Sequence, residues 1–361
     1  MIRGGKSGRA SFRLKPSLVI FLAGVLLLAG CRSPSLPQAL QRFEFKHPAM
    51  GTLFTITLYA SNQAVAEGAA DAAFRRIDAL EDILSDYQAD SELMRLCDQP
   101  FGKPVAVSPD LFDVLQRAQK VSRLSGGAFD VTVGPYVRLW RFARKRKVLP
   151  TPAEVAAARA AVGWQKLRLD RDARTVTLLA PNMRLDLGGI GKGCAADHAL
   201  QTLKGRGVDH ALVAASGDVA IGNPPPGQAG WKIGIATFGT RTNQLSRTVV
   251  LHNAGVSTSG DSEQFIEIGG VRYSHIVNPA TGLGLTNRIQ ATIIGPNATT
   301  TDSLDAAVSI LGVRRGLALA DSLRGTAACI VTREDGQEQS FTSRRFKRIP
   351  QETKQVCSPA R

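Results

Sequence analysis

A succession of short strand-like segments joined by turns constrains the fold of this chain more than any other feature. The segments lie between residues 166 and 277, and one helical segment, from about Gly193 to Lys204, interrupts them. In order they are KLRLD, RTVTLLA, MRLDLGG, HALVAAS, WKIGIA, TVVLHNAGV, EQFIEI and VRYSHIV. Because helices do not alternate regularly with strands, the pattern predicts an α+β fold with a mixed, largely antiparallel sheet rather than a doubly wound one. The pair Gly269-Gly270, between the last two segments, predicts a tight hairpin.

Amphipathic helices and further strands flank this region. The segment GTLFTITLYA alternates apolar residues and threonines with the period of a half-buried strand, and apolar residues then recur at helical spacing from 64 to 84. A second helix is expected after Ser108-Pro109-Asp110, a typical helix start. Near the C-terminus, the strand-like segments RIQATIIG and TAACIVT enclose helices expected at 301–311 and 313–323. We therefore expect helices packed on the sheet in a single large domain of one or two lobes.

The first thirty residues have the composition of a secretory signal. Basic residues precede an apolar run, Leu18–Ala29, which contains no acid and is short for a permanent membrane helix. The run ends in Leu28-Ala29-Gly30-Cys31, which resembles a bacterial lipobox, where the signal is cut before a cysteine that is then acylated. Arg32, rather than aspartate, favours the outer membrane over the inner one. We expect an exported, periplasm-facing lipoprotein held in membrane lipid through Cys31; the alternative is an ordinary signal peptide with a chance cysteine.

The mature chain is basic. Of the formal net charge of +15, five positive charges lie in the signal, so about +10 remains. Part of it lies in RFARKRK (141–147) and RRFKR (344–348), which are typical of solvated loops or tails, the alternative being attraction to anionic lipid or a phosphate-bearing ligand. Nothing predicts nucleic acid as a partner. We divide the chain into a signal peptide (1–30), a tether (31–42), one folded domain (43–335) and a basic tail (336–361).

A glycine-rich loop follows one strand-like segment in the middle of the chain. In LDLGGIGKG (185–193), Gly193 stands where a P-loop needs Ser or Thr, and the glycine spacing differs from the dinucleotide fingerprint. Other segments also place glycine or another small residue beside one acid, base or hydroxyl. They are AMGT (49–52), LSDY (84–87), SGGAFDVTVGP (125–135), STSGD (257–261), SHIVNPATG (274–282) and TTDSLDAA (300–307). Together they predict one site at which backbone closely approaches a ligand.

These segments, in this order, resemble the ApbE family of FAD:protein FMN transferases over about residues 43–335. The strongest matches are GGAFDVTVGP, DLGGIGKG, STSGD and HIVNPATG. The resemblance implies an ApbE-like, T-fold-like architecture and FAD as substrate: its pyrophosphate is cut, FMN is attached through a phosphoester to a threonine of an acceptor protein, and AMP leaves. It also implies a divalent ion, usually Mg²⁺. The acceptors would be membrane redox subunits of the Rnf and Nqr kind or exported FMN-binding-domain proteins.

The resemblance also implies roles for individual residues. His275 matches the catalytic position, where an imidazole acts on the threonine proton or orients phosphate. The metal would be bound by the carbonyl of Gly189 and the carboxylate of Asp302. Taken singly, these residue types also allow structural roles, such as a core methionine, a capping aspartate or a lysine facing water. The residues expected to contact FAD are Met50, Tyr87, Ala128, Phe129, Asp130, Asp186, Lys192 and, through its backbone, Ile276.

Two positions depart from the family pattern. Family members typically carry a threonine ligand four residues after the metal-binding aspartate, but position 306 is alanine. Either Asp305 reaches the ion, directly or through water, or a water replaces the hydroxyl, since magnesium readily retains water. Asn278 replaces an aspartate, which removes a charge but keeps a turn-forming side chain. Two alternatives to FMN transfer follow: an FAD pyrophosphatase giving FMN and AMP, or a non-catalytic FAD-binding lipoprotein.

Overall fold

The computed structural model describes residues 39–235, 238, 247–260 and 265–352. Residues from Leu40 onward form one compact unit. The expected signal peptide, the acylated Cys31 and most of the tether lie outside the described residues, as does Asp261 of the STSGD segment. Within the described part, no helix is long and apolar enough to cross a membrane.

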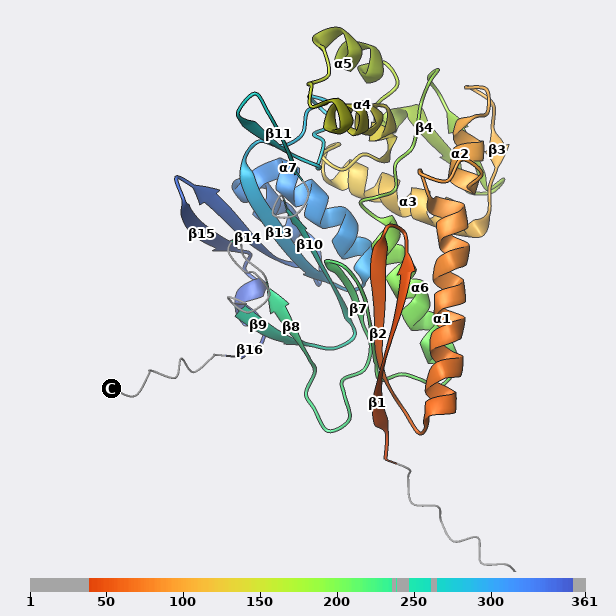
Figure 1. The fold of residues 1–361 in the computed structure, drawn as a ribbon, viewed down its shortest axis with the longest axis vertical. Coiled ribbons are helices and arrows are strands. Elements are labelled where there is room, and N and C mark those ends of the chain that lie inside the picture. Colours follow the sequence, from red (N-terminus) through yellow and green to blue (C-terminus); the bar gives the residue numbers. More distant parts are fainter. Residues whose placement is uncertain (1–38, 236–237, 239–246, 261–264, 353–361) are drawn as a thin grey trace, which may run out of the picture. The chain divides into compact units, whose positions relative to one another are not determined.

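An eight-stranded sheet lies at the centre of this unit, in the order β1-β2-β6-β7-β10-β13-β14-β15 (Figure 1). Each strand is antiparallel to its neighbour. The expected α+β class with a largely antiparallel sheet is therefore confirmed. The strands are β1 (Gln41–Ala49), β2 (Thr52–Ala60), β6 (Ala211–Ala215), β7 (Asp218–Ile221), β10 (Ala254–Gly260), β13 (Arg288–Gly295), β14 (Ala327–Glu334) and β15 (Gln337–Thr342).

Three smaller sheets complete the strand content of the described residues. The expected hairpin at Gly269-Gly270 is confirmed: both glycines have positive φ, of 59° and 76°, and they join β11 to β12. The bounds are β11 (Phe265–Ile268) and β12 (Val271–Ser274); β8 (Trp231–Ile235), β9 (Arg247–Leu251) and β16 (Gln351–Glu352); and β3 (Val105–Ala106), β4 (Leu167–Asp170) and β5 (Thr175–Leu178).

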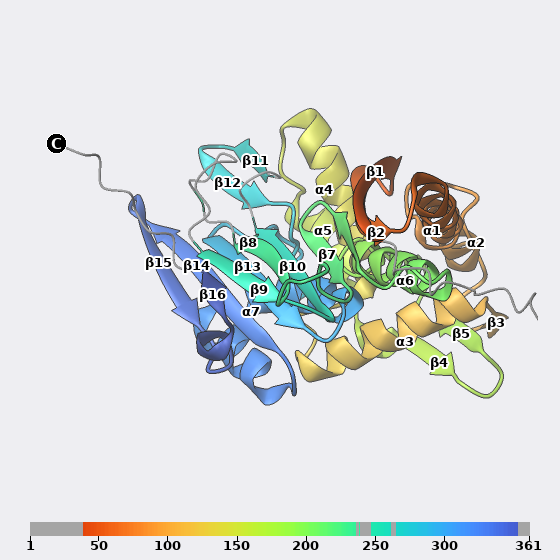
Figure 2. The same ribbon diagram turned by 90° about the horizontal axis from the view of Figure 1, so that it is seen from below.

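Strand side chains alternate between two hydrophobic cores, as the period of two requires. In β13, Ile289, Ala291 and Ile293 belong to the large core, whereas Ile294 belongs to a second one. The second core is closed by β8, β9 and the 3-10 helix η3 (Phe346–Arg348), whose Phe346 is fully buried. The main sheet thus separates a helical layer from the small β8–β9–β16 sheet, and Figure 2 shows α7 and β8 on opposite sides of β13.

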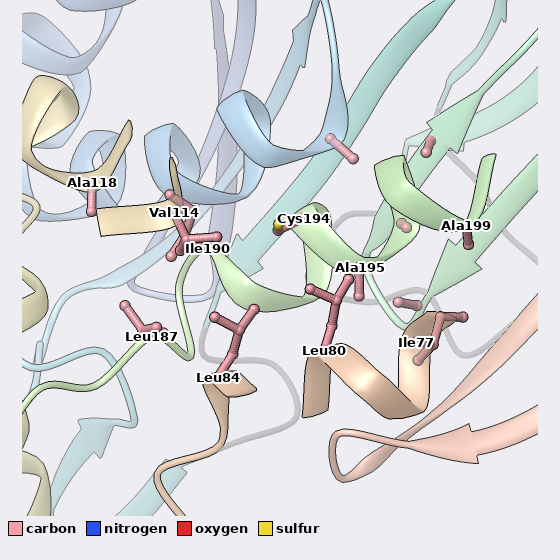
Figure 3. Packing of buried hydrophobic residues seen from close by; sticks show 14 of the residues in the cluster. Ile77, Leu80, Leu84, Val114, Ala118, Leu187, Ile190, Cys194, Ala195 and Ala199 are labelled. Carbon is pink, nitrogen blue, oxygen red and sulfur yellow. The ribbon is translucent and has the colours of Figure 1, made fainter. Parts of the chain in front are cut away.

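The helical layer consists of α1 (Gln63–Leu84), α3 (Pro109–Leu124), α6 (Gly191–Gly205) and α7 (Ala298–Ser322). Figure 3 shows α6 packed on α1, with small side chains of α6 facing larger ones of α1. Because these α6 residues are small, the two helices lie close together. The residues that meet are Ile77, Leu80 and Leu84 of α1 and Ala195 and Ala199 of α6.

A separate cluster joins α4 (Gly134–Arg146) and α5 (Pro152–Arg159) to the β11–β12 hairpin. Trp140 of α4 donates its indole N–H to the Gly282 carbonyl at 2.9 Å, and its ring lies 5.2 Å from that of Tyr273. The segment that contains His275 is thereby fixed to α4. The remaining helical elements are α2 (Glu92–Cys97), η1 (Val131–Val133) and η2 (Trp164–Lys166).

Two expected strands are wrong. MRLDLGG is extended but pairs with no strand, because its N–H groups bond elsewhere: Leu185 donates to the Cys97 sulfur and Asp186 to the Val131 carbonyl. TVVLHNAGV is not one strand, because a turn with Asn253 at φ 46° divides it between β9 and β10, which belong to different sheets. By contrast, Gly312 (φ 71°, ψ −176°) breaks α7 between the two helices predicted there.

The basic segments also differ from expectation. We placed a tail at 336–361, but β15 pairs with β14 along the main sheet and Phe346 is buried, so at least residues 337–346 belong to the folded unit. Residues 353–361 lie outside the described residues. In RFARKRK, the residues from Arg144 to Lys147 are exposed as expected, but Ala143 is buried and the segment is not a loop: it forms the last turns of α4, whose C-cap is Lys147 in the left-handed conformation.

The start of α6 touches the start of α7. A Cβ atom built on Gly193 would lie 2.3 Å from the Ala298 carbonyl oxygen, a distance that excludes any side chain. Asp197, one helical turn later, accepts N–H groups of Ala298 and Thr299 and so caps α7. Glycine at 193 therefore sets how close the two helix N-termini lie.

We expect Gly193→Ala to lower the free energy of unfolding by about 1–3 kcal/mol, because the added methyl group overpacks the contact with α7. Gly191→Ala is the matched control, since a Cβ atom there meets nothing within 4 Å. The control is expected to stay within about 1 kcal/mol of the parent. Urea unfolding measures both, and equal stabilities would contradict the close-packing argument.

Candidate active site

The glycine-rich loop is anchored on both sides before α6 begins. Leu187 and Ile190 are buried in the large core (Figure 3), while Gly188 is exposed. The Asp186 carboxylate accepts the Gly188 N–H at 2.8 Å. Apolar side chains thus hold the loop against the helices, and its glycine backbone lies nearer the surface.

Three aspartates from different elements converge beside this loop. Asp218, at the start of β7, and Asp302 and Asp305, on α7, are buried, and one carboxylate oxygen from each lies within 4.8 Å of the others. The Lys192 ammonium forms an ion pair with Asp218 and lies 3.9 Å from Asp302. The other Asp302 oxygen accepts the Gly193 N–H at 2.8 Å. We call these four side chains the acidic cluster.

Burial controls the protonation of the acidic cluster. Burial, and next the charge of Asp218, raises the pKa of Asp302 to about 7. The same causes, together with Asp302, raise the pKa of Asp305 well above its ordinary value. Burial alone would lower the pKa of Lys192, but the charges of Asp302 and Asp218 raise it. The cluster therefore has an excess of negative charge that a proton or a cation must balance.

Gly189 adjoins this cluster. A Cβ atom built there would lie 3.3 Å from the Phe129 ring and 3.9 Å from the Ala306 methyl group. Position 306 follows Asp302 by one helical turn, so both residues project from the same face of α7. The structure thus brings the loop next to the helix face on which the resemblance places the metal.

A second charged group lies between α4 and the loops. Arg141 forms an ion pair with Asp86, and its guanidinium lies 3.7 Å from Asp186. The guanidinium also lies 3.9 Å from the centre of the Tyr87 ring, which is 80% exposed. Burial, and next the charge of Asp86, raises the pKa of Asp186 to about 6. Arg141 therefore joins two residues, Tyr87 and Asp186, that the sequence assigned to FAD.

Asp130 caps the 3-10 helix η1, the structural role that its residue type allows beside the predicted contact with FAD. Its carboxylate accepts the N–H and the hydroxyl of Thr132, at 2.8 and 2.7 Å. Burial raises its pKa despite these hydrogen bonds. Ala128 and Phe129, just before it, are buried, and Met50 lies in the β1–β2 turn with φ 50°. Their expected contacts with FAD remain predictions.

The His275 segment is a structured turn at the end of β12. His275 is exposed, whereas Ile276 is buried and uses both backbone groups locally, donating to the Ser274 hydroxyl and accepting from Leu285. The Asn278 side chain accepts the Ala280 N–H at 2.9 Å, so it does form the expected turn. His275 is placed by this turn and by its attachment to α4.

Sequence analysis missed three residues of these groups: Asp218, Asp86 and Arg141. Asp218 follows the β6–β7 turn in the string SGD, which has the same glycine-beside-acid pattern that singled out the other segments. Asp86 lies within LSDY, where only the tyrosine was chosen. Arg141 carried no such signal, because only the helical conformation of α4 separates it from its basic neighbours.

Comparisons with known proteins agree with this geometry. The model of the ApbE family matches residues 50–331. The FAD:protein FMN transferase of Vibrio cholerae is 30% identical over 334 residues, 91% of this chain and 97% of that protein. Its counterpart in Salmonella typhimurium is 31% identical over 338 residues, 91% of this chain and 95% of that protein.

Solved structures are similar as well. The flavin transferase ApbE from Vibrio cholerae has a TM-score of 0.78 at 28% identity, covering 86% of this chain and all of that one. The Pseudomonas stutzeri flavinyl transferase ApbE, in its apo form, has a TM-score of 0.77 at 29% identity, covering 86% and 97%. With a family match across most of the folded unit and the same architecture, this chain belongs to the ApbE family.

Proposed function

We propose that this protein transfers FMN from FAD to a threonine of an acceptor protein and releases AMP. The observation that carries the proposal is the acidic cluster beside the glycine-rich loop, in a chain whose relatives are named FAD:protein FMN transferases. A threonine hydroxyl is a weak nucleophile and a pyrophosphate carries like charges. Such a transfer needs a cation, a base and hydrogen-bond donors, and the site contains candidates for each.

The acidic cluster fits magnesium. Its donors are carboxylate oxygens, Gly189 lies next to Ala306 one helical turn after Asp302, and magnesium prefers oxygen ligands. When ionised, three carboxylates face one ammonium, so an added divalent cation would balance the charge. We propose that Asp302, Asp305 and Gly189 hold the ion, with Asp218 beside them. Bound there, magnesium would neutralise charge on the phosphates.

The remaining site residues position the reactants. Lys192 is held by Asp218 and Asp302, so its ammonium is fixed at the edge of the proposed phosphate site. Tyr87, Arg141 and Asp186 form one connected group suited to a nucleotide. His275 would accept the threonine proton as the new oxygen–phosphorus bond forms and the bond to the AMP oxygen breaks.

We also propose where the enzyme works and on what. The lipobox and signal support an exported lipoprotein, anchored through Cys31 and facing the periplasm, with the outer membrane favoured. Acceptors in that compartment would be Rnf- or Nqr-type subunits or exported FMN-binding-domain proteins. Cell fractionation tests the anchor: the protein is expected in the membrane fraction, and the control variant Cys31→Ser is expected outside it.

Incubation of the purified protein with FAD, Mg²⁺ and an FMN-binding-domain acceptor is expected to give flavin fluorescence on the acceptor in a denaturing gel, with one AMP per label. Asp302→Ala should lower this rate by about 100-fold or more, as expected for lost charge stabilisation. Asp172→Ala, at an exposed position, is the matched control. AMP without labelled acceptor would indicate a pyrophosphatase, and neither product would favour binding alone.

Metal-free protein is expected to lose stability as the pH rises from about 4 to 7. The pKa of Asp302 is about 7 in the folded state and 3.8 ordinarily, so the folded state binds more protons than the unfolded state in this interval. The stabilisation from Asp302 is fully present below about pH 4 and is lost above about pH 7. Urea unfolding with EDTA measures it.

Asp302→Asn provides the control, because an amide does not titrate and should reduce the slope of that profile, to which Asp305 still contributes. Added Mg²⁺ should raise the midpoint of unfolding more at about pH 8 than at about pH 6, since its ligands must be deprotonated. A variant with the parent's pH slope, or a metal effect independent of pH, would exclude Asp302 as the titrating ligand.

Ala306→Thr is expected to raise the affinity for Mg²⁺ about tenfold, or about 1.4 kcal/mol. The new hydroxyl would be added on the helix face beside Gly189, one turn after Asp302. Ala306→Val adds the same bulk without the oxygen and is the control. Calorimetric titration of Mg²⁺ without FAD measures both, and equal affinities in the two variants would show that position 306 offers no ligand.

A further inference from the structure

The exposed side of α4 carries cations around one aromatic ring. Phe142 is 44% exposed, and the guanidinium carbons of Arg138 and Arg146 lie 6.0 and 5.8 Å from its ring centre. Lys145 projects from the same side, since residues three, four, seven and eight apart share a helix face. We call Arg138, Phe142, Lys145 and Arg146 the basic face of α4; Arg144 and Lys147 are exposed beside it.

These cations have no counter-ion among the residues that the structure describes. Within the described residues, none of Arg138, Lys145 and Arg146 forms an ion pair, whereas Arg141 on the same helix has two. The Glu154 carboxylate accepts the N–H and the hydroxyl of Thr151, and these hydrogen bonds, followed by the charge of Arg146, lower its pKa. Among the described residues these positive charges are therefore unpaired, and they repel one another along the helix.

The basic face adjoins the proposed active site. Arg141, which contacts Asp186 and Tyr87, is three residues from Arg138 and four from Lys145. Side chains at these spacings lie about 5–6 Å apart at their Cβ atoms. The buried side of the same helix holds the His275 segment through Trp140. A macromolecule seated on the basic face would therefore lie beside the group formed by Tyr87, Arg141 and Asp186.

We propose that the basic face of α4 is the docking surface for the acceptor protein, which would present an acidic patch beside its threonine. This inference rests on the proposed transferase function. An acceptor must cover the surface around the site to bring its threonine to the phosphorus, and the uncompensated cations lie on that surface. Arginine around an exposed aromatic ring is typical of protein interfaces, where such residues dominate the binding energy.

An anionic bilayer is the other macromolecule that this charge fits, but the position of the face argues against it. A flat membrane lying on α4 would cover the neighbouring group of Tyr87, Arg141 and Asp186 and exclude the acceptor. The proposed lipid anchor at Cys31 would also hold the protein to the membrane through the tether, so membrane attachment would not require α4. Charge on the basic face would instead speed encounter with an acidic acceptor, an effect that salt weakens.

Charge reversal tests the proposal. In the triple variant Arg138→Glu/Lys145→Glu/Arg146→Glu, we expect kcat/KM for an FMN-binding-domain acceptor to fall by about tenfold or more, mainly through KM. The parent's decline in kcat/KM between low and high salt should be largely lost. The dissociation constant for FAD and the thermal midpoint should stay near the parent values. Arg314→Glu/Arg315→Glu/Arg324→Glu, with the same charge change at exposed positions on α7 and beyond, is the matched control.

The outcomes distinguish this proposal from its alternatives. An unchanged KM for the acceptor, or an equal loss in the α7 control, would overturn it. Loss of sedimentation with phosphatidylglycerol vesicles, with acceptor KM unchanged, would reassign the face to lipid. If the reversed protein melts early, the neutral variant Arg138→Gln/Lys145→Gln/Arg146→Gln replaces it. If the parent labels no acceptor, the transferase function fails, and calorimetric titration of the acceptor against parent and variant still tests docking.

Discussion

The burial of three carboxylates beside a single lysine is the constraint on which the rest of the site depends. Removing an ion from water costs several kcal/mol even after relaxation, and Asp218, Asp302 and Asp305 are all almost fully buried. Lys192 and the Gly193 N–H offset part of this cost. The remainder is met by protonation, which explains the raised pKa of Asp302, or by a bound cation. A fold optimised for stability alone would not keep such a group.

Close helix packing makes this arrangement possible. Asp302 reaches the Gly193 N–H only because the N-termini of α6 and α7 nearly touch, which a glycine permits and any larger residue prevents. A carboxylate meets N–H groups at each helix N-terminus, Asp302 at Gly193 of α6 and Asp197 at Ala298 and Thr299 of α7, where negative charge is favoured. The loop before α6 is held by Leu187 and Ile190 in the core. The glycines therefore serve packing and ligand approach together.

The sequence predicted what local periodicity controls. The antiparallel class, the Gly269-Gly270 hairpin, the main helices and the break near Gly312 follow from spacing and turn residues, and all are confirmed. The strand predicted at MRLDLGG is wrong because an apolar segment of this kind resembles a strand in sequence whether or not a partner strand exists. Asp218 was missed because its relation to Asp302 spans strand and helix, and no local pattern encodes that contact. Site roles drawn from the family resemblance remain predictions.

In helix α4, three consecutive residues face three different surroundings, which the sequence alone does not reveal. RFARKRK has the composition of a solvated run, yet the helical period assigns its neighbours to different faces. Trp140 faces inward and holds the His275 segment, Arg141 faces the acid pair, and Phe142 faces solvent among cations. Rotation by about 100° per residue therefore links the His275 turn, the acids around Arg141 and the outer surface through three consecutive residues. A protein that binds the exposed face of α4 would therefore contact a helix whose other faces already hold the His275 segment, Asp86 and Asp186.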